Sequence, residues 1–469
     1  MSASRWPLAA IFALAVVLRG LPFWLHQWTP EHVTIVDSTR YLELAERLLA
    51  GYGFSLPHAS GADVSELFDV PEVFRTPGYP LVLAAASWLP GSQLVWVLGL
   101  QVVAGILLVA LGYWLVASWA GHRAGLAAAL LLALDPAHVV YANLLMADIL
   151  AAAAVGCGLA TIELASRRKD AESRPEHRRT LLLLAAGACL TVATALRPVA
   201  ALLWLPAAVF LKWRGVGLRA VAVFAAAALL FPLAWSARNA QRTEEWTLST
   251  AFDVNLALVA AAKVEARHTG VTRAAGERAV LQRVAELQGV SVSESPGTAD
   301  FHRVCFHHAC REVGLETLRR APRATAAEVF ASAVELMFAG ERRYLYQVLG
   351  RPLTGPGLGD VNRQLSDVVG TLSGQLSGAF ALVVQAIVMA GVWVLAALGA
   401  RVLWRQRRFD LLFLLVTSVF VVLAPSLVVA SGRLRIPISL VIYALAGIGA
   451  ARLWPSGISP EPSALHKNE

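Results

Sequence analysis

Charged residues are scarce in this chain of 469 residues. They make up 15% of the sequence, and hydrophobic residues make up 57%, whereas roughly a quarter of a typical soluble domain is charged. This shortage excludes an ordinary soluble globular protein, so lipid must surround most of the chain. Two windows, Leu94–Ala117 and Gly378–Ala400, contain no charged residue at all. Each is longer than the roughly 20 residues that cross a bilayer as a helix.

Cysteine is also scarce, with four in the chain. The first two lie in apolar spans, where a thiol packs as a small hydrophobic side chain. The other two, Cys305 and Cys310, flank the pair His307 and His308 in a polar segment. A zinc site or a disulfide is an alternative interpretation of this segment. It is disfavoured because a single Cys/His cluster lacks the second ligand pair of a zinc motif.

Two sequence signals of other protein classes are absent. No glycine-rich turn lies between a strand and a helix, as nucleotide binding would require. The first apolar stretch has Arg19 and Pro22 where a signal peptide would have a small-residue cleavage site, so we expect a membrane anchor. The net charge of +8 could indicate nucleic-acid binding. The basic residues instead cluster in short loops, as cytoplasmic loops require, and we expect no nucleic-acid partner.

Long apolar segments recur along the chain and predict an all-α polytopic membrane protein. A further apolar stretch, 78–89, is too short to span and suits an interfacial or re-entrant helix. We expect about ten transmembrane helices and two large external loops that contain interfacial helices. The ten predicted spans are 6–25, 93–118, 122–140, 145–165, 180–196, 198–212, 217–236, 377–400, 409–430 and 435–453.

Basic residues predict the orientation of these spans. With the N-terminus inside, the inside segments hold 17 basic residues and the short outside segments hold six. Counting 78–89 as a span would place the basic run of 166–180 outside, which the positive-inside rule disfavours. We therefore expect both termini in the cytoplasm and both large loops outside.

Helices are also predicted within the two large external loops, and the topology divides the chain into four regions. The sequence predicts a helix over 38–50 and amphipathic stretches over 277–288 and 323–339, the last beginning at Pro322. Residues 78–89 and these amphipathic stretches could form an interfacial groove for a lipid tail. The regions are an N-terminal transmembrane module (1–236) with a catalytic first external loop (26–92), an external helical loop (237–376), C-terminal transmembrane helices (377–454) and a disordered tail (455–469).

Ionisable residues from separate spans and loops fall at the outer side of the membrane. Such groups are costly at membrane depth and are functional candidates. Asp37 is the foremost, because it precedes the 38–50 helix as an N-cap type of residue and could also act as a general base. The outer residues are Asp37, Arg75, Asp135, Asp148, Arg197, Arg238, Arg433 and Arg435.

The order of these motifs resembles the type-C membrane glycosyltransferases. That family includes bacterial relatives of dolichyl-phosphate-mannose protein mannosyltransferases and of the lipid A aminoarabinose transferase. The matching elements are Asp37-Ser-Thr-Arg-Tyr with Gly51-Tyr-Gly-Phe-Ser55, Arg75-Thr-Pro-Gly-Tyr79-Pro80, Pro136 with Leu145-Met-Ala-Asp148, Arg197-Pro198, Arg238-Asn239 and Gly432-Arg433-Leu-Arg435-Ile-Pro437.

The resemblance implies a glycosyltransferase whose donor is a polyprenyl-phosphate-linked sugar and whose acceptor is a lipid, glycan or protein hydroxyl. It implies that Asp37 is catalytic and that arginines at the outer face hold the carrier phosphate. The substrate-binding and phosphate-binding residues it predicts are Arg75, Tyr79, Asp148, Arg197, Arg238, Arg433 and Arg435.

We expect the chain to differ from the larger members of this family, which have a soluble C-terminal domain that these 469 residues do not contain. Ser38 stands where some members have a second acidic residue. We therefore expect no particular cofactor, and a divalent metal ion is the alternative. We expect the protein to lie in the bacterial inner membrane, with its active site facing the periplasm or the exterior. The alternatives are a lipid or glycan transporter (flippase), and a ligase that uses a polyprenyl-diphosphate-linked glycan.

Overall fold

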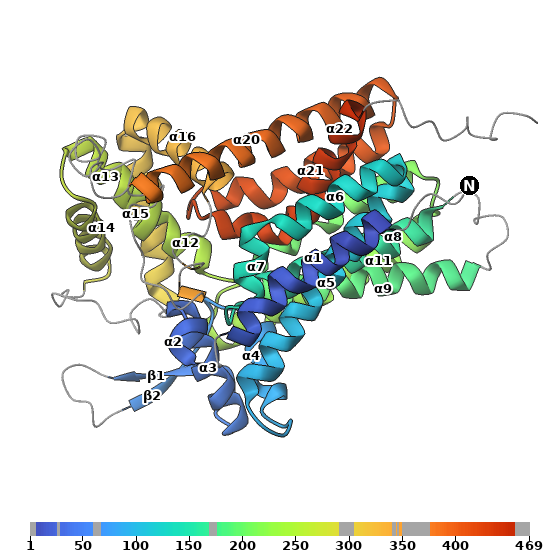
Figure 1. Ribbon diagram of the computed structural model, residues 1–469. Helices are drawn as coiled ribbons and strands as arrows, with labels where there is room; N and C mark the ends of the chain where they lie inside the picture. The colour runs from blue at the N-terminus through green and yellow to red at the C-terminus, as the bar shows by residue number, and fades with distance from the viewer. Residues whose placement is uncertain are drawn as a thin grey trace, which may run out of the picture.

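The structure, a computed structural model, is a helical bundle with two external segments at one end (Figure 1). It describes residues 6–25, 29–59, 67–167, 176–289, 304–339, 344, 347–348 and 376–454. Among these residues, eight helical segments are long and apolar enough to cross a membrane. They are α1 (Trp6–Leu25), α5 (Gln93–Ala120), α8 (Asp148–Ser166), α9 (Glu176–Leu196), α11 (Leu218–Thr243), α20 (Leu376–Arg405), α21 (Phe409–Ser426) and η5 with α22 (Gly432–Ile438 and Ser439–Leu453).

The two remaining predicted spans are less regular. The 122–140 segment consists of α6 (His122–Leu134) and α7 (Pro136–Ala142), which are bent by 55° and would make a ninth span together. Pro136 lacks an N–H, and Asp135 caps α7 by accepting a hydrogen bond of 2.9 Å from the Ala137 N–H. The 198–212 segment is a shorter apolar stretch of η2 (Pro198–Leu202) and α10 (Trp204–Trp213).

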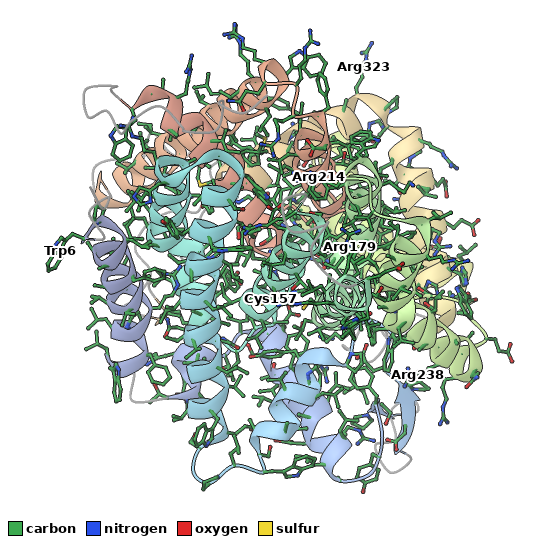
Figure 2. The ribbon with its side chains drawn as sticks, turned by 90° about the vertical axis from the view of Figure 1, so that its right-hand side faces the viewer. Trp6, Cys157, Arg179, Arg214, Arg238 and Arg323 are labelled. Carbon is green, nitrogen blue, oxygen red and sulfur yellow. The ribbon has the colours of Figure 1, made fainter. Side chains whose placement is uncertain are left out.

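Helices α8 and α22 form the centre of the bundle. Of their apolar windows, 72% and 83% of the residues are buried, against 22% for α1 and α20, which face outward. Glycines allow the closest approach: a Cβ at Gly399 of α20 or at Gly449 of α22 would collide with the backbone of the other helix. Small residues at such interfaces let helix backbones pack directly in a membrane. The outward face stays apolar, and Trp6, which is 82% exposed, projects from the bundle (Figure 2).

The first external segment contains α2 (Pro30–Val33), α3 (Val36–Leu49) and α4 (Gly78–Ala86). Helices α3 and α4 match the predicted helices over 38–50 and 78–89, and α2 was not predicted. The nine residues of α4 are too few to span, as predicted. An antiparallel hairpin of β1 (Ser55–Ala59) and β2 (Leu67–Pro71) was not predicted. Its strands have five residues each and contain proline, so they carry no clear alternating pattern.

The second external segment is helical, as predicted. It contains α12 (Ala251–Asn255), the π-helix η3 (Leu256–Ala261), α13 (Ala262–Thr269), α14 (Arg273–Leu287), α15 (Val304–Arg320) and α16 (Pro322–Phe338). Pro322 is the first residue of α16, as predicted. The predicted tail, 455–469, lies outside the described residues.

Hydrogen bonds tie the two external segments together. The Thr250 N–H donates to the Val73 carbonyl at 3.0 Å, and the Ser249 hydroxyl donates to the Phe74 carbonyl at 2.6 Å. Both segments therefore lie at the same end of the bundle, as the predicted topology requires. The site described below lies where they meet the membrane helices.

Candidate functional site

Asp37 lies in the first turn of α3 and does not cap it. The helix begins two residues earlier than predicted, with Ile35 at the N-cap, so the predicted capping role of Asp37 is wrong. Ser38 fixes this helix start instead: its hydroxyl accepts from the Ile35 N–H at 3.0 Å and donates to the Leu145 carbonyl at 2.9 Å. The Asp37 carboxylate is left to interact with side chains from other segments.

Arg75 is presented to Asp37 by a short turn. The Glu72 carboxylate shapes this turn, because its Oε1 accepts hydrogen bonds from the Phe74 and Arg75 N–H groups at 2.6 and 2.8 Å. The Arg75 Nη2 then donates to the Asp37 Oδ1 at 3.0 Å. Glu72 is fully buried and is a positioning residue that the sequence analysis missed.

Arg433 approaches the same carboxylate from the opposite end of the chain. It is the second residue of η5, which follows the end of α21, and its Nη1 lies 2.8 Å from the Asp37 Oδ2. Each Asp37 oxygen therefore has its own guanidinium partner. The side chains are 11% exposed for Arg75, 20% for Arg433 and 23% for Asp37, so solvent can still reach them.

Arg197 and Asp148 form a second ion pair beside the first. Residue Pro198 disfavours helical geometry at the residue before it, so α9 ends at Leu196 and Arg197 lies at the break. Asp148 is the first residue of α8, where a helix N-terminus stabilises a carboxylate. The Arg197 Nη2 donates to the Asp148 Oδ2, and Asp148 is fully buried.

Close packing brings α4 against the end of α9. A Cβ on Gly78 would lie 2.5 Å from the Ala195 carbonyl carbon and oxygen, so only glycine permits this approach. Gly78 follows Arg75 by three residues and Ala195 precedes Arg197 by two. The contact thus sets the distance between Arg75 and Arg197.

Asp37, Arg75, Arg197 and Arg433 line one cavity of about 480 Å³, together with residues from other segments. These four are charged, and most of the others are apolar, as is typical of pockets for amphipathic ligands. The lining residues are Asp37, Tyr41, Phe74, Arg75, Thr76, Leu196, Arg197, Pro198, Val199, Leu202, Thr247, Leu248, Ser249, Ala251, Phe252, Asn255, Val421, Pro425, Ser426, Val428, Val429, Arg433 and Leu434.

The predicted groove from 78–89 is not part of this cavity. None of those residues lines it, and neither do 277–288 or 323–339. The apolar wall comes instead from the end of α21, the start of η2 and α12. Tyr79 and Leu83 of α4 are fully buried against the bundle. The exposed apolar side chains of this segment, Leu81, Trp88 and Leu89, do not line the cavity.

Electrostatics in the cavity favour the ionised form of Asp37. Burial alone would raise the pKa of Asp37, but the nearby charges of Arg433, Arg75 and Arg197 outweigh it and hold the pKa well below its usual range. Burial raises the pKa of the Tyr41 phenol, which therefore stays neutral at ordinary pH. We call Arg75, Arg197 and Arg433 the cavity arginines.

The candidate residues Arg238 and Arg435, and also Arg19 of α1, bind backbone carbonyls. Arg238 donates to the Phe54 and Glu72 carbonyls at 2.8 and 2.9 Å, beside the hairpin (Figure 2). The Arg435 guanidinium donates to the Leu336, Met337 and Ala339 carbonyls at the end of α16, and Arg19 donates to the Leu132 and Ala133 carbonyls at the end of α6. We call Arg19, Arg238 and Arg435 the anchor arginines.

Two further candidate residues also lie away from the cavity. The Tyr79 hydroxyl donates to the Gln101 Oε1 at 2.6 Å, and its ring packs on Tyr41 with centroids 5.1 Å apart, so it supports the cavity from behind. Asp135 accepts a hydrogen bond of 2.7 Å from the Tyr443 hydroxyl. The structure thus brings together Asp37, Asp148 and the cavity arginines, and leaves Tyr79, Asp135 and the anchor arginines outside.

The cavity does not suit a divalent metal. Asp37 in the cavity and Asp148 beside it are already paired with guanidinium groups, and three cations surround them. A metal ion would add two positive charges to this group. Outside the cavity, Glu245, His307 and His308 could hold a metal ion, because one ligand atom from each lies within 4.8 Å of the others.

Comparison with known proteins shows the fold. No protein family's sequence profile matches the chain, and no curated protein matches it. The apo structure of the Archaeoglobus fulgidus oligosaccharyltransferase is similar over 96% of this chain and 51% of that one, with 14% identity and a TM-score of 0.51. Because the identity is low, this similarity shows a shared fold alone, and the chain spans about half the length of that enzyme.

Two further structures are more distant. AglB from Archaeoglobus fulgidus, in complex with an inhibitory peptide and a dolichol-phosphate, covers 94% of this chain and 50% of its own at 14% identity and a TM-score of 0.49. ArnT from Cupriavidus metallidurans, bound to undecaprenyl phosphate, covers 96% and 79% at 16% identity and a TM-score of 0.39. The chain thus shares its fold with the Archaeoglobus fulgidus oligosaccharyltransferase.

Proposed function

We propose that this protein is a membrane glycosyltransferase that moves a sugar from a polyprenyl-phosphate-linked donor to a hydroxyl acceptor. One observation carries the proposal: three arginines and a carboxylate from four distant segments line a single cavity whose other walls are mostly apolar. Arginine binds phosphate oxygens through a planar fork and stays charged. A lipid phosphate ester needs both the charged pole and the apolar wall.

Charge matching favours a monophosphate donor. The cavity arginines carry three positive charges, and Asp37 and Asp148 carry two negative charges, which leaves one positive charge. A polyprenyl-phosphate sugar is a phosphodiester with a single negative charge. A diphosphate-linked glycan carries a second charge, which this cavity would leave uncompensated in a poorly solvated place. The ligase alternative is therefore less favoured.

In the mechanism we propose, the donor phosphate replaces Asp37 as the partner of Arg75 and Arg433. The Asp37 carboxylate is then released and its pKa rises, since the cations that lower it now face the phosphate. Asp37 takes the proton of the acceptor hydroxyl while that oxygen attacks the anomeric carbon. The sugar–phosphate bond breaks, and the polyprenyl phosphate leaves with the bonding electrons.

Charge develops on the leaving phosphate during this step. The cavity arginines are fixed by helix ends and turns, so they stabilise that charge without reorganising. A single base on the acceptor side supports direct displacement with inversion at the anomeric carbon. The ion pair of Arg197 and Asp148 holds the other side of the phosphate site in the same way.

The isoprenoid tail would lie along the apolar wall. Val421, Pro425, Val428, Val429 and Leu434 line that side of the cavity, at the end of α21 and the start of η5. Each buried methylene contributes about 0.8 kcal/mol, so the tail would supply most of the affinity and the phosphate would set the position of the sugar.

The transporter alternative is less favoured by the position of the site. Transporter sites lie near the bilayer midplane between repeated halves. Here the charged residues meet beside the two external segments, at one end of the bundle. We propose that this end faces the periplasm or exterior of a bacterial inner membrane, with both termini in the cytoplasm. Reporter fusions at residues 300 and 454 should give external and cytoplasmic signals, respectively.

A donor assay tests the proposed activity. Protein in lipid nanodiscs should release label from a polyprenyl-phosphate sugar onto a hydroxyl acceptor. It should ignore nucleotide sugars and polyprenyl-diphosphate glycans supplied without other enzymes. Transfer directly from a nucleotide sugar, or from a diphosphate donor alone, would contradict the proposal.

A further inference from the structure

The external helix α15 carries two adjacent histidines with different surroundings. His307 is 1% exposed, and its Nδ1 lies 3.0 Å from the Asp253 Oδ2 of α12. Its other ring nitrogen, Nε2, is buried and has no hydrogen-bond partner. A buried imidazole nitrogen without a hydrogen-bond partner is uncommon, and it indicates that a ligand binds at this position.

The neighbouring residues provide the other ligands. His308 stacks beside His307 with ring centroids 4.4 Å apart, and its Nε2 is hydrogen-bonded to the Glu245 Oε1. Glu245 follows the end of α11 and is 62 residues earlier in the chain than His307. The ligand atoms of the three residues all lie within 4.8 Å of one another. The sequence alone shows the histidine pair but not this third ligand.

We propose that Glu245, His307 and His308 bind one divalent cation of the zinc class. Two imidazoles and one carboxylate form a common zinc ligand set that keeps a fourth position open. Asp253 would be the outer partner, because a carboxylate that holds the far nitrogen of a ligand histidine fixes the orientation of its ring. Arg311 already pairs with both Asp253 oxygens, at 2.9 and 2.7 Å, so Asp253 stays in that outer position.

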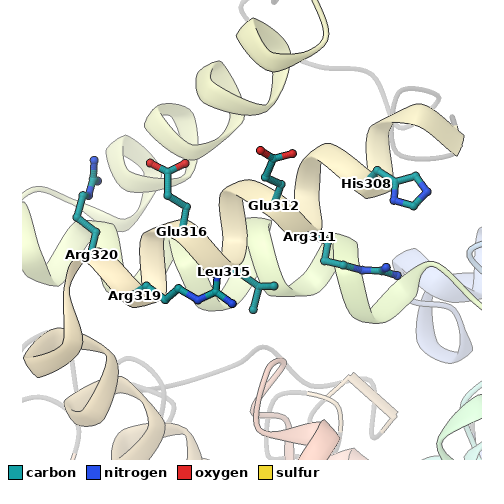
Figure 3. A pocket seen from close by; sticks show the side chains of 7 residues that line it. All are labelled: His308, Arg311, Glu312, Leu315, Glu316, Arg319 and Arg320. Carbon is teal, nitrogen blue, oxygen red and sulfur yellow. The ribbon is translucent and has the colours of Figure 1, made fainter.

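The open position would face solvent. His308 has a half-exposed side chain and lines a hollow of about 860 Å³ along α15. In Figure 3, Arg311, Leu315 and Arg319 project to one side of the helix and His308 lies at its end. Water, or a polar group of a substrate, could complete the coordination from this side. Cys310 does not take part, since it is a free thiol buried in the apolar cluster of α15 and η3.

A bound ion would join α15 to two segments that line the cavity. Glu245 lies two residues before Thr247, which begins the stretch 247–249 that lines the cavity, and Asp253 lies in α12, which lines it as well. The ion would therefore hold this wall against α15. This inference does not rest on the proposed glycosyltransferase activity, and its test uses binding and stability.

Metal titration of the full-length protein tests the site. The affinity tag is removed, the protein is stripped with chelator in nanodiscs, and Zn²⁺ is titrated by calorimetry, with Co²⁺ absorption as a second readout. We expect one ion per chain, a Co²⁺ spectrum typical of mixed nitrogen and oxygen ligands, and a higher melting temperature with Zn²⁺.

Matched variants assign the ligands. Glu245→Gln and His308→Gln both change partly exposed residues, and each should weaken Zn²⁺ binding at least about 100-fold, while Asp253→Asn should weaken it about 10- to 100-fold. Glu316→Gln, on the same helix, and His268→Gln, on α13, should bind as wild type does. A wild-type protein that binds no ion, or variants that bind as tightly as these controls, would overturn the proposal.

Discussion

The cavity arginines and the anchor arginines lie in the same region but differ in their partners. The cavity arginines face carboxylates, whereas the anchor arginines donate to backbone carbonyls at helix ends and beside the hairpin. A carboxylate can be displaced by another anion, but a carbonyl at a helix end needs its donor whenever the protein is folded. Arg433 and Arg435 show both roles within one turn of η5. Partner chemistry, more than depth in the membrane, therefore separates function from support.

Removing the carboxylate base should have the largest effect. Asp37→Asn keeps the shape of the side chain but cannot accept a proton, so transfer should fall roughly 10²- to 10⁴-fold. Steady-state rates in nanodiscs measure this. Asp69→Asn is the matched control, since Asp69 lies in the hairpin, pairs with Arg47 of α3 and does not line the cavity. Wild-type turnover in folded Asp37→Asn protein would remove Asp37 from the mechanism.

Replacing a cavity arginine should have the next largest effect. Arg433→Ala removes a charge-assisted contact worth about 1.5–3 kcal/mol, so transfer should fall roughly 10- to 150-fold. Donor affinity should weaken as well, and Lys should restore activity poorly because it lacks the planar fork. Unchanged affinity and rate in Arg433→Ala, and likewise in Arg75→Ala, would show that these arginines do not hold the phosphate.

Separating α4 from α9 should have a moderate effect. Gly78→Ala places a Cβ 2.5 Å from the Ala195 carbonyl, so the two segments must move apart and carry Arg75 away from Arg197. Small displacements of this kind in catalytic geometry justify an expected loss of about tenfold in kcat. Gly391→Ala in α20 is the control, because its Cβ meets nothing within 4 Å. Equal kcat values for the two variants would contradict this role of Gly78.

Replacing an anchor arginine should lower stability more than activity. Arg435→Met leaves buried carbonyls at the end of α16 without donors, each costing about 1–3 kcal/mol. The melting temperature should drop, while transfer per folded molecule stays within about threefold of wild type, as expected of a change outside the site. A loss of donor affinity as large as that of Arg433→Ala, at unchanged stability, would place Arg435 in the phosphate site instead.

The smallest expected effect is a difference between the pH dependence of kcat and that of kcat/KM. In the free protein, Asp37 has a lowered pKa, so its ion pairs are present above the ordinary value of about 3.9 and are lost only as the pH falls through the lowered pKa. The donor phosphate then replaces Asp37 as the partner of Arg75 and Arg433, which raises that pKa. The acidic limb of kcat should therefore lie at higher pH than that of kcat/KM. Coinciding limbs would argue against the exchange of partners.

The sequence predicted most of the fold because hydrophobic length and charge bias act locally. The spans, the short α4 and the start of α16 at Pro322 all follow from composition and proline position. The β-hairpin was missed because its short, proline-containing strands carry no clear alternating pattern. The bend after α6 has a local signal in Pro136, which the prediction of a single span over 122–140 did not use. The sequence also could not exclude the 78–89 groove, because burial of α4 against the bundle cannot be seen from its apolar residues alone.

The candidate site was predicted in part for the same reason. The motifs identified Asp37, Asp148 and the cavity arginines, but they gave equal weight to Arg238, Arg435 and Tyr79, whose partners become visible only in three dimensions. Glu72 and Glu245 were missed. Neither has a sequence signal of its own, since one acts through a turn and the other through histidines far along the chain.

Binding of polyprenyl phosphate to Asp37→Asn tests the central claim most directly. The account holds that Asp37 occupies the cavity arginines until a lipid phosphate replaces it. Calorimetry or native mass spectrometry in nanodiscs should therefore show the variant binding polyprenyl phosphate at least as tightly as wild type, and up to about tenfold more tightly, because one competing anion is gone. Its transfer activity should be lost in the same preparation. Clearly weaker binding by the folded variant would contradict the account.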